Sequence, residues 1–176
     1  LKIQHTEFYR SLKIKKTENK YLKNSSNFVF IVGMPRSGST LLENILSLNS
    51  EVSDMGEVNF LEESIKESKN LEDVYDLYEK KVINQFQSSI IYTDKSLFNY
   101  MYCAVISNFF PKAKIINCIR NPLDNILSIY RANFLKQSFS FSLTDISSLY
   151  LNYFETMEEY KIKSVSYTHL RAHETV

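Results

Sequence analysis

The stretch from Phe28 to Leu46 constrains the fold of this chain more than any other. It begins with an apolar run, breaks into a turn built from Gly, Pro and Ser, and resumes with apolar residues at helical intervals. Short apolar runs bounded by turn residues are typical of buried strands, and apolar positions three and four apart are typical of helices. The stretch therefore predicts a strand, a tight loop and a helix in succession.

Glycine usage singles out the same loop. Average usage of about 7% would give roughly twelve glycines in a chain of this length, whereas the 176 residues contain three. Gly33 and Gly38 lie in this loop, and the third is Gly56. Glycines let the backbone turn sharply so that successive N–H groups point inward, and the N-terminus of the following helix favours negative charge. We therefore interpret the loop as an anion-binding cradle.

The side chains of the loop suit a phosphate or sulfate group. Arg36 supplies a forked cation, and Ser37, Ser39 and Thr40 supply hydroxyls. A plain strand-to-helix turn would need neither the arginine nor three hydroxyls. The loop is not a Walker A loop, because Ser39 stands where the GxxxxGK[ST] pattern requires lysine. This difference argues against an ordinary ATPase or GTPase.

Composition limits the remaining classes. With 44% apolar residues, the chain can bury one core and is about the length of one domain. The net charge is +1 and the lysines are scattered, so we expect no nucleic-acid partner. No apolar run approaches the roughly 20 residues that span a bilayer, so no membrane anchor is predicted. Cys103 and Cys118 lack metal-ligand spacing and are interpreted as reduced core residues, which favours a reducing compartment.

The two ends of the chain are expected to lie outside the domain. Residues 1–27, rich in Lys, Asn and Ser, are interpreted as a linker or as the end of a missing N-terminal region. Residues 165–176 resemble the translated read-through of a sequencing-library adapter and are interpreted as an artefact. Residues 28–164 then form a partial, truncated domain.

Strands and helices alternate through this domain. Ile90 to Thr93 and Ala113 to Ile119 read as strands, and the apolar spacing predicts helices between and after them. This alternation indicates βαβ units with parallel strands and right-handed crossovers. We predict an α/β fold of the P-loop type, with three layers and a central parallel sheet flanked by helices. The helices are predicted at Thr40 to Leu48, Asn59 to Ser68, Leu71 to Gln87, Tyr100 to Phe110, Pro122 to Tyr130 and Leu143 to Lys161.

The loop resembles the nucleotide-binding loop of the sulfotransferases that use 3′-phosphoadenylyl sulfate (PAPS). The resemblance is to the branch related to tyrosyl-protein sulfotransferases, which includes bacterial members with tetratricopeptide repeats. That branch has arginine where small-molecule sulfotransferases usually have lysine, and Arg36 fits it. Ser39 replaces the commoner threonine and keeps the hydroxyl. The resemblance implies the cytoplasm for a bacterial protein and the Golgi lumen for a eukaryotic one.

A second segment, residues 117–128, is similar to the strand, loop and helix that bind the 3′-phosphate in this family. The resemblance implies that Arg120 and Ser128 hold that phosphate, and an arginine fork with a hydroxyl can clamp one phosphate from two elements. Taken alone, the same two residues could be an ordinary surface arginine and serine.

The resemblance also assigns two catalytic residues. Glu57 corresponds to the proposed base of the family, although glutamate is common in the first turn of any helix and Asp54 is a competing carboxylate. Lys95, in a Thr-Asp-Lys segment, would stabilise charge during transfer. The usual proline after this lysine is absent, so a solvated lysine remains an alternative. Asp94 is expected to orient the loop. Four tyrosines (Tyr92, Tyr100, Tyr102 and Tyr130) could line an acceptor cleft or belong to the core.

The resemblance thus implies transfer of a sulfuryl group from PAPS to a hydroxyl or amine, with 3′,5′-bisphosphoadenosine (PAP) as product and no metal. Glu57 would take the acceptor proton, while Lys95 and Arg36 stabilise charge; the acceptor itself and the oligomeric state are left open. The cofactor ligands implied are Gly33, Arg36, Ser37, Gly38, Ser39, Thr40, Arg120 and Ser128. Two alternatives are a P-loop nucleotide kinase or hydrolase, and a non-catalytic nucleotide-binding fragment.

Overall fold

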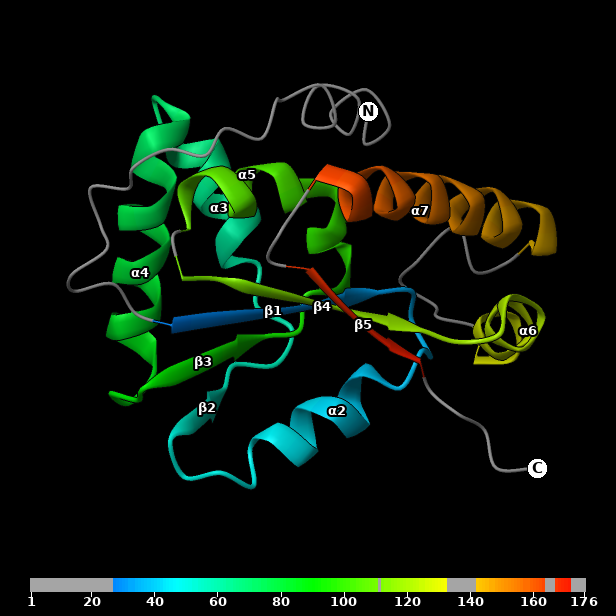
Figure 1. Cartoon of the computed structure of the whole chain (residues 1–176), viewed down its shortest axis with the longest axis horizontal. Coiled ribbons are helices and arrows are strands. Elements are labelled where there is room, and N and C mark those ends of the chain that lie inside the picture. Colours follow the sequence, from blue (N-terminus) through cyan, green and yellow to red (C-terminus); the bar gives the residue numbers. More distant parts are fainter. Residues whose placement is uncertain (1–26, 111, 133–141, 164–166, 172–176) are drawn as a thin grey trace.

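The computed structural model describes residues 27–110, 112–132, 142–163 and 167–171, and this part of the chain forms a three-layer α/β fold (Figure 1). The central sheet has five strands in the order β2-β3-β1-β4-β5, and every pairing is parallel. The strands are β1 (Asn27–Gly33), β2 (Val52–Asp54), β3 (Ile91–Asp94), β4 (Lys114–Ile119) and β5 (Tyr167–Arg171). The predicted fold class is confirmed.

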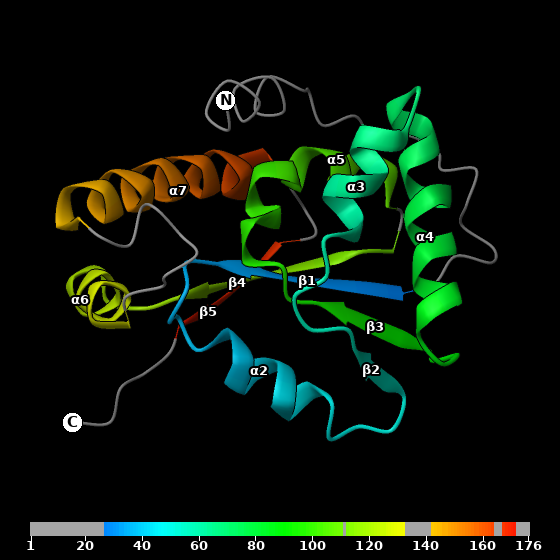
Figure 2. The same ribbon diagram turned by 180° about the vertical axis from the view of Figure 1, so that it is seen from behind.

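Helices cover both faces of the sheet. Helices α3, α4, α5 and α7 lie over one face and α2 lies under the other, as both ribbon views show (Figures 1 and 2). The helical elements are α2 (Ser39–Leu46), α3 (Phe60–Glu67), α4 (Val74–Gln85), α5 (Cys103–Phe109), α6 (Pro122–Ala132) and α7 (Leu143–Lys163), with 3-10 turns η1 (Leu71–Asp73) and η2 (Leu97–Tyr102). Of the helices in the described part of the chain, none combines the length and apolar character that crossing a membrane requires.

The core between the sheet and its upper helices is dominated by aromatic rings. Phe28 and Phe30 of β1 lie against Tyr78 of α4 and against Phe110, and most of these contacts are edge to face. The ring centroids of Phe28 and Tyr78 are 5.0 Å apart at 86°. Such pairs add to the stabilisation from buried area alone. The aromatic cluster fixes the central strand that carries the loop.

Both cysteines are buried and free, as the sequence predicted. Cys103 begins α5 and Cys118 lies in β4. Burial raises the pKa of the Cys118 thiol to about 11, and it also raises the pKa of the Cys103 thiol. The neutral thiol is therefore the stable form of each, which fits a role in packing.

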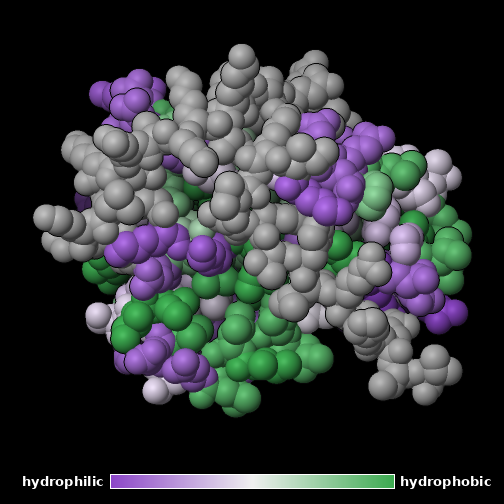
Figure 3. Space-filling model, viewed as in Figure 1, coloured by the Kyte–Doolittle hydropathy of each residue, from purple (hydrophilic) through white to green (hydrophobic). Residues whose placement is uncertain are grey.

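Helix α2 forms where predicted but presents its residues differently from an ordinary amphipathic helix. Its buried residues are Ser39 and Glu43, whereas Leu41 and Ile45 are 66% and 55% exposed. The space-filling view shows the resulting hydrophobic surface over α2 (Figure 3). Polar side chains thus face the sheet at this helix, which is unusual unless they have partners there.

Two short elements differ from what the sequence patterns predicted. Strand β2 is three residues long and half-buried, so it has no apolar run to indicate it. The predicted helix from Tyr100 begins earlier, as the 3-10 turn η2. Of the predicted linker, residues 1–26 lie outside the described residues, and Asn27 is the first residue of β1.

Strand β5 falls in the segment that the sequence led us to interpret as adapter read-through. It pairs with β4 in parallel register, with Ile115 opposite Tyr167. The pattern of residues 165–176 did not predict a strand there. The foreign origin of this segment stays a prediction, which the full-length gene sequence tests.

The junction of β1 and β4 generates a prediction at Gly33. A Cβ at this position would lie 2.7 Å from the carbonyl oxygen of Cys118, and the φ angle of Gly33 is 148°. Overpacking and a forced backbone conformation each cost about 1–3 kcal/mol, so we expect Gly33→Ala to lower the free energy of unfolding by about 3 kcal/mol or more. Urea denaturation measures this loss.

Gly56→Ala is the matched control. Gly56 also has a positive φ, 65°, but a Cβ there would meet nothing within 4 Å. Only the backbone cost of roughly 1–2 kcal/mol then applies. Equal losses in the two variants would contradict the proposed clash with β4.

Candidate active site

The site lies at the carboxyl edge of the sheet, where four neighbouring strands end. In the spatial order β2, β3, β1 and β4, these strands are followed by Glu57, Lys95, the loop of residues 34–38 and Arg120. Ligands of open α/β sheets bind outside the carboxyl ends of the strands. Residues from four distant parts of the sequence therefore reach one edge because all four strands run in the same direction.

The loop between β1 and α2 has the backbone of an anion-binding turn. Arg36 has a φ of 68° and Gly38 a φ of 90°, and Gly38 is the N-cap of α2. A left-handed conformation is uncommon for a residue with a Cβ, and arginine holds it here. Left-handed residues in turns let neighbouring N–H groups converge, and the first N–H groups of a helix have no partner within it.

Two clefts open beside this loop. The first has a volume of about 710 Å³ and the second about 500 Å³. Arg36 and Arg120 line both clefts. The first is also lined by Pro35, Gly38, Ser39, Thr40, Glu57, Asn59, Glu62, Ser96, Leu97, Phe98, Asn99, Met101 and Tyr102, and the second by Asp124, Leu127, Ser128, Arg131 and Ala132.

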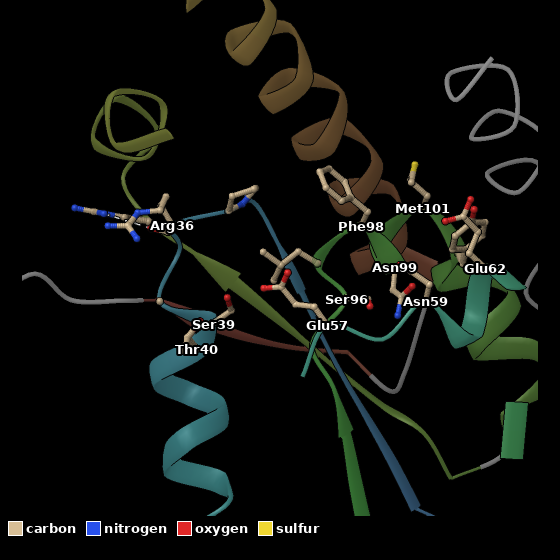
Figure 4. A pocket seen from close by; sticks show the side chains of 15 residues that line it. Arg36, Ser39, Thr40, Glu57, Asn59, Glu62, Ser96, Phe98, Asn99 and Met101 are labelled. Carbon is tan, nitrogen blue, oxygen red and sulfur yellow. Dashed lines mark hydrogen bonds between the residues drawn. The ribbon is translucent and has the colours of Figure 1, made fainter. Parts of the chain in front are cut away.

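Most of the predicted site residues line these clefts. In the first cleft, Arg36, Ser39 and Thr40 lie on one side, with Glu57 between them and the apolar side chains of Phe98 and Met101 (Figure 4). Ser128 lines the second cleft. Three predicted residues line neither cleft: Gly33, Ser37 and Lys95.

Ser37 lies on the inner side of the loop. Its side chain is buried, and its Oγ lies 3.2 Å from where a Cβ of Gly33 would stand. Within the described residues this hydroxyl makes no hydrogen bond. The Ser37 side chain therefore does not line either cleft.

The second motif holds the first in place. Arg36 Nε donates a hydrogen bond to Ser128 Oγ at 3.2 Å, and Arg120 donates to the Arg36 carbonyl oxygen at 3.3 Å. Asn125 of α6, a buried residue, donates to the Pro35 carbonyl oxygen at 2.8 Å. Two segments about 90 residues apart in the sequence thus form one unit.

Glu57, which lines the first cleft, forms an ion pair with Lys95. Lys95 Nζ lies 2.9 Å from Glu57 Oε1. The side chain of Lys95 is 7% exposed and that of Glu57 is 70% exposed. The lysine is therefore buried, and the alternative of a solvated lysine is wrong. The carboxylate is the accessible member of the pair.

Glu43 of α2 is the third member of this charged group, and the sequence did not single it out. Its side chain is 5% exposed, and its Oε2 lies 3.8 Å from Lys95 Nζ. Burial raises the pKa of the Glu43 carboxyl, while Lys95 and hydrogen bonds from Gly56 and Thr93 act in the opposite direction. A usable signal was present, because Glu43 follows Ser39 by four residues and so shares the loop-facing side of the helix.

Arg131 was also missed. It lines the second cleft together with Ser128. The two are three positions apart on α6, which places them on one helix face. That spacing could have indicated a second cation beside the predicted hydroxyl.

Asp94 orients the segment after β3, as predicted. Its carboxylate accepts hydrogen bonds from the Ser96 N–H at 2.9 Å and from the Tyr78 hydroxyl at 2.8 Å. Burial raises the pKa of Asp94 to about 6. Asp54, the competing candidate for the base, ends β2, and neither aspartate lines the two clefts.

Only one of the four tyrosines considered for the acceptor cleft lines it. Tyr102 belongs to the first cleft. Tyr92 and Tyr100 are core residues, and Tyr130 is 46% exposed but lies outside both clefts. In the described part of the chain, no group of three or more His, Cys, Asp or Glu side chains is placed to hold a metal ion.

The fold and this site define an α/β protein in which a loop with left-handed residues follows the central strand β1 and an arginine–serine pair follows the neighbouring strand β4. The family model of the sulfotransferase domain matches residues 26–174, and the chain belongs to that family. The matched range includes most of the segment that the sequence led us to set aside.

The chain is also similar to two individual proteins, one in fold and one in sequence. The crystal structure of a sulfotransferase from Alicyclobacillus acidocaldarius superimposes with a TM-score of 0.55 at 17% identity, covering 84% of this chain and 73% of that one. An uncharacterized protein of Aquifex aeolicus (strain VF5) is 28% identical over 159 residues, which are 75% of this chain and 21% of that protein. The chain thus spans about a fifth of that relative's length.

The buried carboxyl of Asp94 generates a prediction about stability and pH. Between pH 3.8 and about pH 6, Asp94 keeps a proton in the folded protein that it has lost in the unfolded chain. The free energy of unfolding therefore falls by roughly 3 kcal/mol as the pH rises through this range. Above about pH 6 the full loss of stability is present. Denaturation at a series of pH values measures how the free energy of unfolding changes with pH. Asp94→Asn should remove the slope of this dependence between pH 3.8 and about pH 6.

Asp145→Asn makes the same substitution at an exposed position on α7. It should retain the slope of the wild-type protein. If Asp94→Asn also retains that slope, the assignment of the raised pKa to Asp94 is wrong.

Proposed function

We propose that this chain carries the nucleotide-binding and catalytic part of a PAPS-dependent sulfotransferase. One observation carries the proposal: Arg36 and Arg120 line both clefts. Arg36 is also hydrogen-bonded to Ser128, which lines the second cleft. PAPS has two separate anionic groups on one nucleotide. A pair of linked anion sites, each with an arginine, matches that arrangement of charge.

The donor set fits the co-substrate. The first cleft offers an arginine fork, the hydroxyls of Ser39 and Thr40, and the N-terminus of α2. The second offers Ser128 and Arg131 beside the two shared arginines. Hydroxyls, guanidinium groups and helix N-termini are the usual ligands of phosphate and sulfate oxygens. We assign the 5′-phosphosulfate to the first cleft and the 3′-phosphate to the second.

PAPS, when bound, supplies an activated sulfuryl group, with PAP as the leaving group. The residues of the chain then have separate roles in the transfer. Glu57 takes the proton from the attacking hydroxyl or amine of the acceptor. Arg36 stabilises the charge on the departing phosphate oxygen, and Lys95 holds the Glu57 carboxylate and adds positive charge near the transferring group. Catalysis of this kind depends on positioning and on charge stabilisation.

The branch of the family is part of the proposal. Arg36 stands where small-molecule sulfotransferases usually have lysine, which supports a place near the tyrosyl-protein and tetratricopeptide-repeat sulfotransferases. The acceptor is a molecule with a free hydroxyl or amine. Leu97, Phe98 and Met101 give its side of the cleft an apolar wall.

Binding of PAP tests the 3′-phosphate assignment. Arg120→Ala removes a charge-assisted contact, which is worth about 1.5–3 kcal/mol, so we expect the dissociation constant to rise by about 10- to 150-fold. Titration calorimetry with PAP measures this change. Performing it with magnesium and with a chelator separates the sulfotransferase from a kinase or hydrolase, whose nucleotide binding depends on the metal.

Lys114→Ala is the matched control for Arg120→Ala. Lys114 is an exposed cation at the other end of the same strand, β4. We expect its removal to leave PAP binding unchanged. Unchanged affinity in Arg120→Ala would overturn the assignment of the 3′-phosphate.

Turnover tests the role of Glu57. Glu57→Gln keeps the size and polarity of the side chain but cannot accept a proton, so kcat should fall by about 10²- to 10⁴-fold while PAP binding is retained. A radiolabelled PAPS assay with a panel of phenols, tyrosine peptides, glycans and lipids measures transfer. Glu62→Gln changes the other carboxylate of the same cleft. A loss in Glu62→Gln without a loss in Glu57→Gln would identify Glu62 as the base.

A further inference from the structure

Glu43 is a buried carboxylate that the reaction proposed above does not use. It lies on α2, one helical turn beyond Ser39 at the anion-binding loop, and its side chain is 5% exposed. Glutamate is almost never this buried unless it has partners. Leu41 and Ile45 of the same helix are exposed instead. The helix therefore directs a charged side chain inward at the cost of leaving apolar ones in solvent.

The partners of Glu43 come from both segments that carry the catalytic pair. Its Oε1 accepts hydrogen bonds from the Gly56 N–H at 3.2 Å and from the Thr93 hydroxyl at 3.3 Å. Its Oε2 faces Lys95 Nζ at 3.8 Å. Gly56 precedes Glu57 directly, and Thr93 lies two residues before Lys95.

The two segments are also joined to each other. The Lys95 N–H donates to the Gly56 carbonyl oxygen at 2.9 Å, and the Met55 N–H donates to the Thr93 carbonyl oxygen at 3.0 Å. These bonds fix the segments as a pair, but they do not fix the pair relative to α2. Within the described residues, Glu43 makes the side-chain contacts from α2 to Gly56, Thr93 and Lys95.

We propose that Glu43 is a positioning residue that locks the base segment and the Lys95 ammonium group to the helix of the anion-binding loop. The inference rests on the proposed function, since it deepens the role of the same site. Glu43 thus connects the part of the cleft assigned to the sulfuryl donor, at Ser39 and Thr40, to the part that holds the base, Glu57. Displacement of reacting groups by about 1 Å can cost about 10²-fold in rate.

The charge of Glu43 is as important as its shape. Lys95 lies between Glu43 and the exposed Glu57 carboxylate. Without the buried negative charge, the ammonium group has only Glu57 as a partner in this group of three. The lysine is then drawn toward the base, and its position relative to the anion-binding loop is lost.

Glu43→Gln separates charge from shape. Glutamine can still accept the hydrogen bonds of Gly56 and Thr93 but does not attract Lys95. We expect kcat for transfer from PAPS to fall by about 10- to 100-fold, while the dissociation constant and the binding stoichiometry of PAP stay within about twofold of the wild-type values. A merely destabilised protein would instead lose PAP stoichiometry in proportion to its activity.

Glu79→Gln is the matched control. Glu79 of α4 also accepts a hydrogen bond from a hydroxyl, that of Tyr75, and lines neither cleft. Its kcat should equal that of the wild-type protein. Equal kcat values in Glu43→Gln and Glu79→Gln overturn the proposal.

A second measurement reports on the position of the base segment without any activity. The chain has three glycines, so a sample labelled with [¹⁵N]glycine gives three amide signals. Loss of one signal in Gly56→Asn assigns it to Gly56. In Glu43→Gln the Gly56 signal should move because a hydrogen bond to a charged acceptor becomes one to a neutral acceptor, and the other two glycine signals should move less.

The same signal follows the protonation of Glu43 in the wild-type protein. Lys95, the Gly56 N–H, the Thr93 hydroxyl and Asp54 are the charged and polar groups that act on this carboxyl. The Gly56 signal should titrate above the usual pH range of glutamate, should still do so in Asp54→Asn, and should not in Glu43→Gln. An unchanged Gly56 signal in Glu43→Gln overturns the positioning role. A wild-type protein that binds no PAP overturns the proposed function instead.

Discussion

The close approach of β1 to β4 at Gly33 is the constraint on which the rest of the site depends. The Cys118 carbonyl oxygen occupies the space that any Cβ at position 33 would need. Because the strands meet so closely, the loop after β1 and Arg120 after β4 leave the sheet side by side. The arginine can then reach the Arg36 carbonyl oxygen, and α6 can place Asn125 and Ser128 against the loop. Two anion sites become one linked pair.

The charged group formed by the buried Glu43 and Lys95 and the exposed Glu57 organises the other half of the edge. Charges are costly to bury unless they are paired and hydrogen-bonded, and Glu43 meets that condition with contacts to Gly56, Thr93 and Lys95. Asp94, the residue before Lys95, follows the same principle. Burial raises its pKa to about 6, and its carboxyl accepts hydrogen bonds from Tyr78 and Ser96. The burial of these carboxyl groups lowers the stability of the fold, and their hydrogen bonds hold the polar groups at this edge in fixed positions.

Much of the fold was predictable because periodicity carries it. The apolar run of β1, the helical spacing after Gly38 and the buried run of β4 each indicated their element within a few residues. Short elements could not be predicted in this way: β2 is three residues long and η2 departs from the helical period. Strand β5 was missed because its residues had been interpreted as foreign sequence. The resemblance to sulfotransferases supplied residues that spacing alone could not have joined.

The sequence by itself determined the class of loop, the parallel α/β architecture and the identity of the residues that follow each strand, because these depend on local chemistry and on strand direction. Only the tertiary structure decided which of those residues meet. It buried Lys95 between two carboxylates, turned Ser37 away from the clefts, and brought Glu43 and Arg131 into the site. The physical reason is that burial and pairing of charge depend on neighbours distant in sequence, and no local pattern records them.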